Sequence, residues 1–253
     1  MTLNTLLCIF AHPDDELYTA GLLAMLASKG VAVHLLCLTR GENGAPGMPR
    51  IAADADLGEI RGREMACAAQ ALGASSLTFM NYIDRLDETG GMTEPAHDAA
   101  TLRAELQAQI RRLSPQAVLT HGSDGEYGHP AHKLLHRLVK EAVFEMAEGE
   151  RPFLYSFMAH FIGQPYLDEV NHSDPADYLI DVRAFQESHV LPMLTCHWTQ
   201  ASWWAHLKSE KLGRPVTIKE AWRKRPFEGI QRQSPPTPTG TDPLGEWLNQ
   251  HAI

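Results

Sequence analysis

The sequence predicts a single, Rossmann-like, doubly wound α/β domain, in which a mostly parallel sheet lies between two layers of helices. Short apolar runs rich in β-forming residues alternate with segments that repeat apolar residues at helical spacing. Most of these runs are apolar at nearly every position, which is typical of strands that are covered on both faces. At 253 residues, of which 44% are hydrophobic, the chain is long enough to bury one such core.

Strands and helices are predicted in alternation from the first apolar run onwards. The predicted strands are Leu6 to Phe10, Val31 to Leu38, Leu77 to Met80, Ala117 to Thr120, Phe153 to Met158 and Tyr178 to Val182. The predicted helices are Glu16 to Gly30, Glu59 to Leu72, Asp98 to Leu113, a helix that begins at Pro130, and Ala184 to His197. Pro192 should kink or interrupt the last of these helices, because proline lacks the backbone donor.

Two segments depart from this alternation. Residues 1–233 are assigned to the α/β domain, and residues 234–253 to a Pro-rich C-terminal tail that includes a candidate short helix, Leu244 to Ile253. Gly41 to Gly58 is a long loop rich in glycine, proline and aspartate. Loops of this length in a compact domain usually serve a function, so we predict that it walls or closes a site, with disorder as the alternative.

Polar residues that can carry chemistry follow the first predicted strand directly. His12, Asp14 and Asp15 come just after Phe10, and in an open parallel sheet ligands bind at the carboxyl ends of the strands. His12 and Asp15 offer a nitrogen and an oxygen to a cation such as Zn²⁺, which leaves Asp14 for proton transfer. The alternative is that the two aspartates only cap the helix that follows.

A second polar cluster, Tyr127 to His132, follows the predicted strand Ala117 to Thr120 and precedes another helix. Two strand ends that each carry histidine favour a converging set of two histidines and one aspartate. Three protein ligands with a fourth position open for water are typical of catalytic zinc sites. The second cluster therefore weakens the capping interpretation of the first.

Together the two clusters resemble the PIG-L/LmbE-like family of zinc-dependent N-acetylglucosaminyl deacetylases. The family motif Ala-His-Pro-Asp-Asp-Glu stands unaltered at Ala11 to Glu16, and a downstream His-Pro-x-His stands at His129 to His132. The resemblance covers the chain to about Gln200 and includes four looser matches, at Thr39 to Glu42, Arg61 to Glu64, Asp84, and His197 to Gln200.

The resemblance implies roles for individual residues of the two clusters and of the looser matches. The expected metal ligands are His12, Asp15 and His132. The expected catalytic groups are Asp14 as general base, and His129 with Tyr127 at the developing oxyanion. The expected substrate contacts are Glu42, Arg61 and Asp84.

One position departs from the family pattern. Family members often carry an acid between the two histidines, where it orients the first, and this chain has Ala131 there. The substitution bears on how His129 is held and charged, and a change in the pKa of His129 would move the pH optimum.

Composition excludes several classes of protein. A formal net charge of -9, from 22 basic and 31 acidic residues, argues against general nucleic-acid binding. No apolar stretch approaches the roughly 18 residues of a membrane span, and the first apolar run is not a cleavable signal because no basic region precedes it. The cysteines lie in apolar segments without Cys-x-x-Cys spacing, so we expect reduced core residues of a cytoplasmic protein: Cys8, Cys37, Cys67 and Cys196.

Between Lys208 and Arg232 basic residues outnumber acidic ones by eight to three. This segment is interpreted as solvated surface. Docking on an acidic face of the same domain or of another subunit remains open, and with it a homo-oligomer. Trp198, Trp203 and Trp204 just before it could stack on sugar rings or pack against the core or a partner subunit.

The function predicted from these features is metal-dependent removal of the N-acetyl group from an N-acetylglucosamine-containing small molecule, releasing acetate and a free amino sugar. The expected metal is Zn²⁺, although such ligands also accept Fe²⁺ or Co²⁺. One alternative is an amidase that cleaves a different amide of a thiol-sugar or other conjugate. Another is a non-catalytic metal- or sugar-binding module, which would have no need of Asp14.

Overall fold

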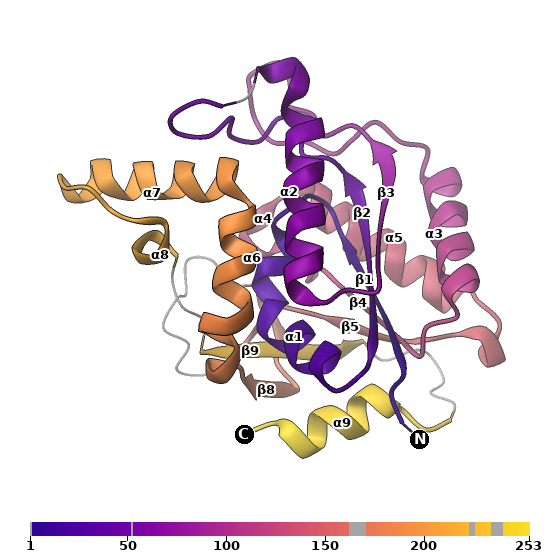
Figure 1. Cartoon of the computed structure of the whole chain (residues 1–253). Helices are drawn as coiled ribbons and strands as arrows, with labels where there is room; N and C mark the ends of the chain where they lie inside the picture. Colours follow the sequence, from indigo (N-terminus) through magenta and orange to yellow (C-terminus); the bar gives the residue numbers. More distant parts are fainter. Residues whose placement is uncertain (1, 52, 162–170, 223–225, 234–239) are drawn as a thin grey trace.

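A mostly parallel sheet forms the centre of the molecule (Figure 1). The computed structural model describes residues 2–51, 53–161, 171–222, 226–233 and 240–253. Within them the sheet has seven strands in the order β3-β2-β1-β4-β5-β9-β8. Their bounds are β1 Thr5–Phe10, β2 Ala32–Thr39, β3 Ser76–Tyr82, β4 Ala117–Thr120, β5 Phe153–Ser156, β8 Tyr178–Asp181 and β9 Phe227–Gln233.

The first five strands of the sheet run parallel, and β9 runs antiparallel to both β5 and β8. The strand order reverses between β1 and β4, which lie side by side with Cys8 opposite Leu119. Ligands bind at such a switch point in doubly wound sheets. Because β1 and β4 are the strands that precede the two polar clusters, the topology brings both clusters to one edge.

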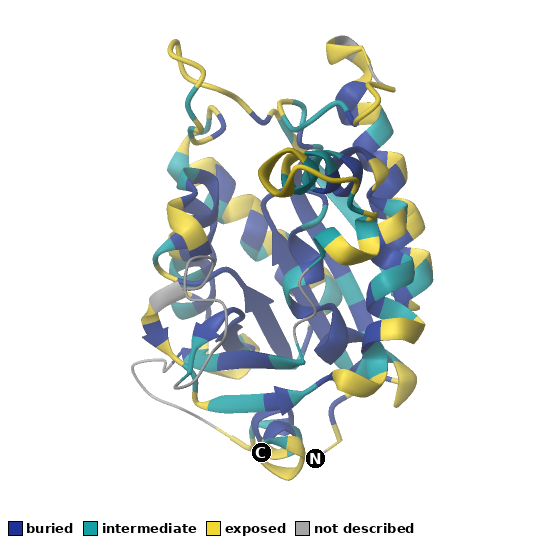
Figure 2. Cartoon of the chain, turned by 90° about the vertical axis from the view of Figure 1, so that its left-hand side faces the viewer, coloured by how far each residue is buried: buried dark blue, intermediate teal, exposed yellow. Residues whose placement is uncertain are grey.

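Helices cover the sheet on both faces. One layer contains α1 Ala20–Ser28, α2 Leu57–Leu72 and α6 Leu191–Cys196, and the other contains α3 Ala99–Leu113 and α5 Pro130–Phe144. Along β1, Leu6, Cys8 and Phe10 join the core under the first layer, while Leu7 and Ile9 join the core under the second. This alternation follows from the two-residue period of a strand, and it confirms the predicted three-layer fold. Figure 2 shows the buried sheet between helices whose outer faces are exposed.

The remaining helices lie around the two layers. They are α4 Gly125–Gly128, α7 Trp198–Leu212, α8 Ile218–Ala221 and α9 Pro243–His251, with short 3-10 turns η1 Asp15–Thr19, η2 Asp54–Asp56, η3 Glu148–Glu150 and η5 Arg183–Phe185, and a π-helical segment η6 Gln186–Val190. A small parallel pair joins β6 Ala159–His160 to β7 Asn171–Pro175. Figure 1 shows α7 projecting from the body with α8 beside it.

Two predicted helices differ in detail from the structure. The chain after β1 first forms the 3-10 turn η1, and α1 begins only at Ala20. The predicted helix Ala184 to His197 is interrupted, as expected, because Pro192 lies in the first turn of α6 after the π-helical segment.

The interpretation of the whole basic segment as solvated surface is wrong, because its last residues form β9. Glu228 on this strand is buried, and its carboxylate accepts hydrogen bonds from the backbone N–H groups of Gly21 and Leu22 at 2.9 Å each. These bonds satisfy free donors in the first turn of α1. The sequence Phe227 to Gln233 is too polar for the pattern of a doubly covered parallel strand, so it was missed.

The C-terminal segment contains the expected short helix, α9. Leu244 and Leu248 of this helix are buried in the core that α1 and α2 also share, and Tyr155 donates a hydrogen bond to Asp242 at the helix start. Residues 234–239, the proline-rich part of the predicted tail, lie outside the described residues. The division of the chain at residue 233 stays a prediction.

The prediction of four reduced cysteines is wrong for two of them. Cys67 on α2 and Cys196 at the end of α6 form a disulfide with a Cα–Cα distance of 5.6 Å, whereas Cys8 and Cys37 are free and buried. Cys67 is an exposed residue rather than a core residue. Sequence spacing did not reveal the pair because 129 positions separate its members. The argument for a reducing compartment therefore no longer holds.

We expect reduction of this disulfide to lower the free energy of unfolding by about 2–4 kcal/mol, because the crosslink restricts the unfolded chain. Urea unfolding with and without dithiothreitol measures the effect. The variant Cys67→Ser serves as the control, since dithiothreitol should not move its midpoint. Equal midpoints for the oxidised and reduced wild-type chain would contradict the prediction.

No helix in the described parts of the chain combines the length and the apolar character needed to cross a membrane.

Candidate active site

The chain leaves β1 through a tight turn that directs Asp14 into a cavity. Asp14 has a left-handed backbone (φ 92°, ψ -15°), and its side chain makes no capping hydrogen bond to the turn that follows. Its N–H donates to Glu16 Oε2 at 3.0 Å, and the other Glu16 oxygen pairs with the buried His197. The capping interpretation of Asp14 is therefore wrong. His197, which belongs to one of the looser matches to the family, supports this turn through Glu16.

His12, Asp15 and His132 come together at the switch point between β1 and β4. His12 Nδ1 lies 3.2 Å from His132 Nε2 and 3.6 Å from Asp15 Oδ2, and His132 Nε2 lies 3.3 Å from Asp15 Oδ1. All three side chains are almost completely buried. Two imidazole nitrogens and a carboxylate that face one another this closely fit the donors of a divalent cation of the zinc type. The set predicted from the sequence is thus assembled.

Glu126 holds His132 from the side opposite to this set. Its Oε2 lies 2.6 Å from His132 Nδ1 and 3.0 Å from His121 Nδ1, and its Oε1 accepts the N–H of Gly122 at 2.8 Å. Burial alone would raise the pKa of Glu126, but the two histidines lower it to about 2. An ionised carboxylate on Nδ1 keeps the proton there and leaves His132 Nε2 free as a ligand.

His121 lies beside the set, but both of its nitrogens are engaged. His121 Nε2 accepts the backbone N–H of Ala11 at 3.0 Å, while Nδ1 faces Glu126. Because a neutral imidazole has one donor and one acceptor, these contacts use both. Asp15, His121 and His132 do have ligand atoms within 4.8 Å of one another, but we assign His121 to support of the loop rather than to the metal.

His129 and Tyr127 line the opposite wall. The ring of His129 stacks on His132 with centroids 4.4 Å apart and lies 4.7 Å from the His12 ring. His129 Nδ1 accepts the backbone N–H of Ala131 at 3.2 Å, so a main-chain donor orients the ring in this chain, where residue 131 carries no acid. Burial, with His132 and His12 nearby, lowers the pKa of His129 to about 3. Its neutral ring then carries the proton on Nε2. The ring of Tyr127, half exposed, stands edge-on to His129.

Arg61 of α2 reaches across to Asp14. Its guanidinium donates to the carbonyls of Pro13 at 2.6 Å and Gly41 at 2.8 Å and lies 3.3 Å from Asp14 Oδ1. A side chain at Gly41 would collide with this guanidinium, so glycine is needed there. Burial raises the pKa of Asp14 to about 6, and Arg61 opposes this shift. Arg61 thus positions Asp14, and because it also lines the cavity, its expected contact with substrate stays a prediction.

Asp84 and Glu42 occupy the rim next to His12. Asp84 Oδ1 lies 3.5 Å from His12 Nε2, and Asp84 lines the cavity. The Glu42 carboxylate accepts the backbone N–H of Asp84 at 2.9 Å, so it supports Asp84 and is not among the residues that line the cavity. Of the expected substrate contacts, Asp84 and Arg61 line the cavity, whereas Glu42 does not.

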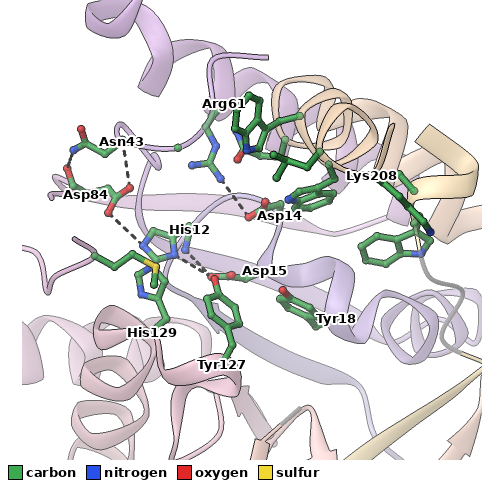
Figure 3. A pocket seen from close by; sticks show the side chains of 18 of the residues that line it. His12, Asp14, Asp15, Tyr18, Asn43, Arg61, Asp84, Tyr127, His129 and Lys208 are labelled. Carbon is green, nitrogen blue, oxygen red and sulfur yellow. Dashed lines mark hydrogen bonds and ion pairs between the residues drawn. The ribbon is translucent and has the colours of Figure 1, made fainter. Parts of the chain in front are cut away.

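One cavity of about 1000 Å³ is lined by seven of the residues described above: His12, Asp14, Asp15, Arg61, Asp84, Tyr127 and His129 (Figure 3). Its second half extends between the loop after β3 and helices α7 and α8.

The predicted loop Gly41 to Gly58 ends earlier than expected, because η2 and the start of α2 take up its last residues. It forms part of the wall through Asn43 and Gly44. Ala45 and Gln200 of α7 exchange hydrogen bonds that attach it. These contacts agree with the predicted role of the loop as a wall of the site. Residue 52 of the loop lies outside the described residues.

Sequence reasoning missed several supporting residues. His136, one turn after His132 on α5, is buried, and its Nδ1 lies 2.8 Å from the carbonyl oxygen of His121. Sequence reasoning assigned no role to His121, although this residue directly follows β4, where a polar residue is a signal. Glu126 stands just before Tyr127, but only its contact with His132 reveals its role.

An α/β sheet with a candidate metal-ligand set at its switch point defines the general class of this protein. A model of the PIG-L family, described as GlcNAc-PI de-N-acetylase, matches residues 7–143. The chain therefore belongs to the PIG-L family, as the two motifs predicted.

Curated relatives carry the name 1D-myo-inositol 2-acetamido-2-deoxy-alpha-D-glucopyranoside deacetylase. The protein from Thermobifida fusca is 34% identical over 162 residues, covering 58% of this chain and 57% of its own. The protein from Acidothermus cellulolyticus is 39% identical over 155 residues, covering 55% and 53%. The chain thus matches little more than half the length of these relatives.

Two solved structures share the fold over most of this chain. The N,N'-diacetylchitobiose deacetylase from Pyrococcus horikoshii has a TM-score of 0.63 at 20% identity, covering 91% of this chain and 84% of its own. GalB, the 4-carboxy-2-hydroxymuconate hydratase from Pseudomonas putida KT2440, has a TM-score of 0.61 at 24% identity, covering 94% and 100%. At these identities the likeness shows the fold alone.

Proposed function

We propose that this protein removes the N-acetyl group from an N-acetylglucosamine-containing small molecule, releasing acetate and a free amino sugar. The observation that carries the proposal is the convergence of His12, Asp15 and His132 within 3.6 Å of one another beside the buried carboxylate of Asp14. The relatives named as deacetylases of an acetamido sugar support the choice of substrate class.

In this proposal His12, Asp15 and His132 hold Zn²⁺, and the same donors would also accept Fe²⁺ or Co²⁺. The metal, when bound, supplies a Lewis acid for the acetamide carbonyl and for water. Asp14 takes the proton of the attacking water and later delivers it to the departing amine. A base with a pKa near 6 suits both transfers at neutral pH.

His129 and Tyr127 are proposed to stabilise the oxyanion. The proton on His129 Nε2 would donate to the oxygen that gains charge as the carbonyl is attacked. Asp84 is proposed to accept a hydrogen bond from a sugar hydroxyl, while Arg61 and Glu42 act through Asp14 and Asp84 respectively. The assignment of Glu42 revises the role expected from the resemblance, and direct contact of Arg61 with substrate stays a prediction.

An acetate-release assay with N-acetylglucosamine conjugates tests the proposal. Metal-loaded protein should release acetate and one equivalent of amine, and protein treated with a chelator should not. Release of a different acid would identify another amidase. Metal binding without any hydrolysis would contradict the proposal and favour a binding module. Because one structural neighbour is named as a hydratase, the fold alone does not select the reaction.

Glu126→Gln is expected to weaken metal binding by about 10–100-fold, because the amide no longer fixes the proton on His132 Nδ1 as a carboxylate does. Competition with a chelating dye measures the metal affinity. Glu148→Gln, an exposed glutamate on η3, is the matched control and should bind as wild type. An unchanged affinity in Glu126→Gln would remove this residue from support of the metal site.

Partners and location complete the proposal. The substrate is a small amino-sugar conjugate, no nucleic acid is involved, and a homo-oligomer stays a prediction that light scattering would test. A cytoplasmic location also stays a prediction. The Cys67–Cys196 disulfide counts against it, because disulfides persist mainly in oxidising compartments. Cell fractionation with antibody detection would decide.

A further inference from the structure

The cavity is larger than a single sugar ring requires. A volume of about 1000 Å³ lies at the upper end of the roughly 300–1,000 Å³ found for pockets that hold drug-sized ligands. His12, Asp15 and Asp14 line one end of the cavity. The other end, which we call the distal arm, is lined by Leu86 and Met92 on one side and by residues of α7 and α8 on the other.

Apolar side chains of the distal arm are open to solvent. Leu86, Met92, Leu207 and Leu212 are 45–50% exposed. Two partly buried indoles extend this surface: the rings of Trp204 and Trp222 lie 6.0 Å apart with planes tilted by 30°. An apolar surface that is continuous with a catalytic cavity is typical of a ligand-binding groove.

Charge is distributed unevenly along the cavity. The lining carboxylates, Asp14, Asp15 and Asp84, belong to the end with the candidate metal ligands, where Arg61 pairs with Asp14. The residues that line the distal arm include Lys208 and Lys211 but no carboxylate. Figure 3 shows Lys208 across the cavity from His12 and His129. This basic end is notable in a chain with a formal net charge of -9.

Lys208 is held in place at this end. Its Nζ donates to the carbonyl oxygen of Glu220 at 2.7 Å, which leaves further ammonium donors for a ligand. Lys208 is only half buried, and Lys211, one turn further along α7, is exposed. A cation next to indoles matches a ligand that is apolar in its body and negatively charged at its end.

We propose that the distal arm binds the substituent attached to the sugar, and that this substituent has an apolar or aromatic body carrying an anionic group. This inference rests on the proposed function, because it assigns the sugar to the end with the candidate metal ligands. Lys208 and Lys211 pair with the anion, and Trp204 and Leu207 contact the body. The arm thereby selects among N-acetylglucosamine conjugates that the reacting centre alone would not distinguish.

Binding of product analogues tests the distal arm without requiring turnover. Calorimetry with the metal-loaded protein compares the methyl, phenyl and 4-carboxyphenyl glycosides of glucosamine. We expect affinity to rise in that order. Lys208→Gln should weaken binding of the carboxyphenyl glycoside by about fivefold, which is the contribution of a partly exposed ion pair. The same variant should bind the phenyl glycoside as tightly as wild type does. Lys29→Gln, an exposed lysine at the end of α1, is the control.

The apolar contacts have a separate test. Trp204→Ala should weaken both aryl glycosides by about tenfold and leave the methyl glycoside unchanged. Because Trp204 also packs against the core, the melting temperature of the Trp204→Ala variant is compared with that of wild type. Leu207→Ser replaces a side chain that is 49% exposed, so it should fold normally and weaken aryl binding by roughly threefold.

The outcomes separate this inference from the proposed function. Acetate release with equal affinity for all three glycosides would overturn the distal arm and leave the deacetylase proposal standing. Selective binding of the carboxyphenyl glycoside that is lost in Lys208→Gln, without acetate release from its N-acetyl form, would support the distal arm and contradict the deacetylase proposal. If the variants leave binding unchanged but convert an oligomer into a monomer, the arm is a subunit interface and the inference is wrong.

Discussion

Replacing Asp14 by asparagine is expected to lower kcat by about 10²–10⁴-fold, the usual cost of losing a general base. An amide cannot take a proton from the attacking water, although it has the size of the carboxylate. Asparagine also tolerates a positive φ better than most residues, so the turn at φ 92° should persist. Metal content should therefore stay near that of wild type. Acetate release and metal stoichiometry are measured on the same preparation.

Asp56→Asn is the matched control for this substitution. Asp56 is exposed and precedes α2 without a capping hydrogen bond, so this variant should keep both full turnover and full metal content. Wild-type turnover in Asp14→Asn, with metal bound, would show that the proton goes elsewhere and that the proposed mechanism is wrong at its central step. A loss of metal would instead assign Asp14 to the ligand set.

Replacing His132 by alanine is expected to abolish stoichiometric metal binding and, with it, acetate release. The wild-type protein should bind about one divalent ion per chain, because His12, Asp15 and His132 form a single converging set. A ligand that binds only the folded state stabilises it by about 2.7 kcal/mol at 100 times its dissociation constant. Zinc should therefore raise the melting temperature of wild type and leave that of His132→Ala unchanged.

Folding of His132→Ala needs its own control, since the substitution leaves Glu126 with one imidazole partner fewer. His136→Ala removes a buried histidine one turn along α5, whose contact is to a backbone carbonyl oxygen. It should lose stability but keep the zinc-dependent rise in melting temperature. Full metal content in His132→Ala would exclude this residue as a ligand. Loss of metal in both variants would point to unfolding instead.

The sequence alone was sufficient for the parallel sheet and for the location of the site. Strands such as β1 and β4 are short apolar runs, and their pattern depends on local burial, which the sequence records directly. The motif after β1 and the His-Pro-x-His after β4 are contiguous, so their residue types and order identified the family before any contact was known. The two motifs contain His12, Asp14, Asp15 and His129 of the cavity lining, while Arg61 and Asp84 come to it from other parts of the chain.

Only the tertiary structure decided which residues support that site. His197 on Glu16 and the guanidinium of Arg61 on Asp14 join positions 181 and 47 residues apart. Such pairs follow from the packing of α2 and α6 on the sheet, and no local periodicity encodes them. The Cys67–Cys196 disulfide and the insertion of β9 beside β5 are of the same kind. A sequence specifies these contacts only through the fold as a whole, because each depends on two distant segments that meet in the tertiary structure.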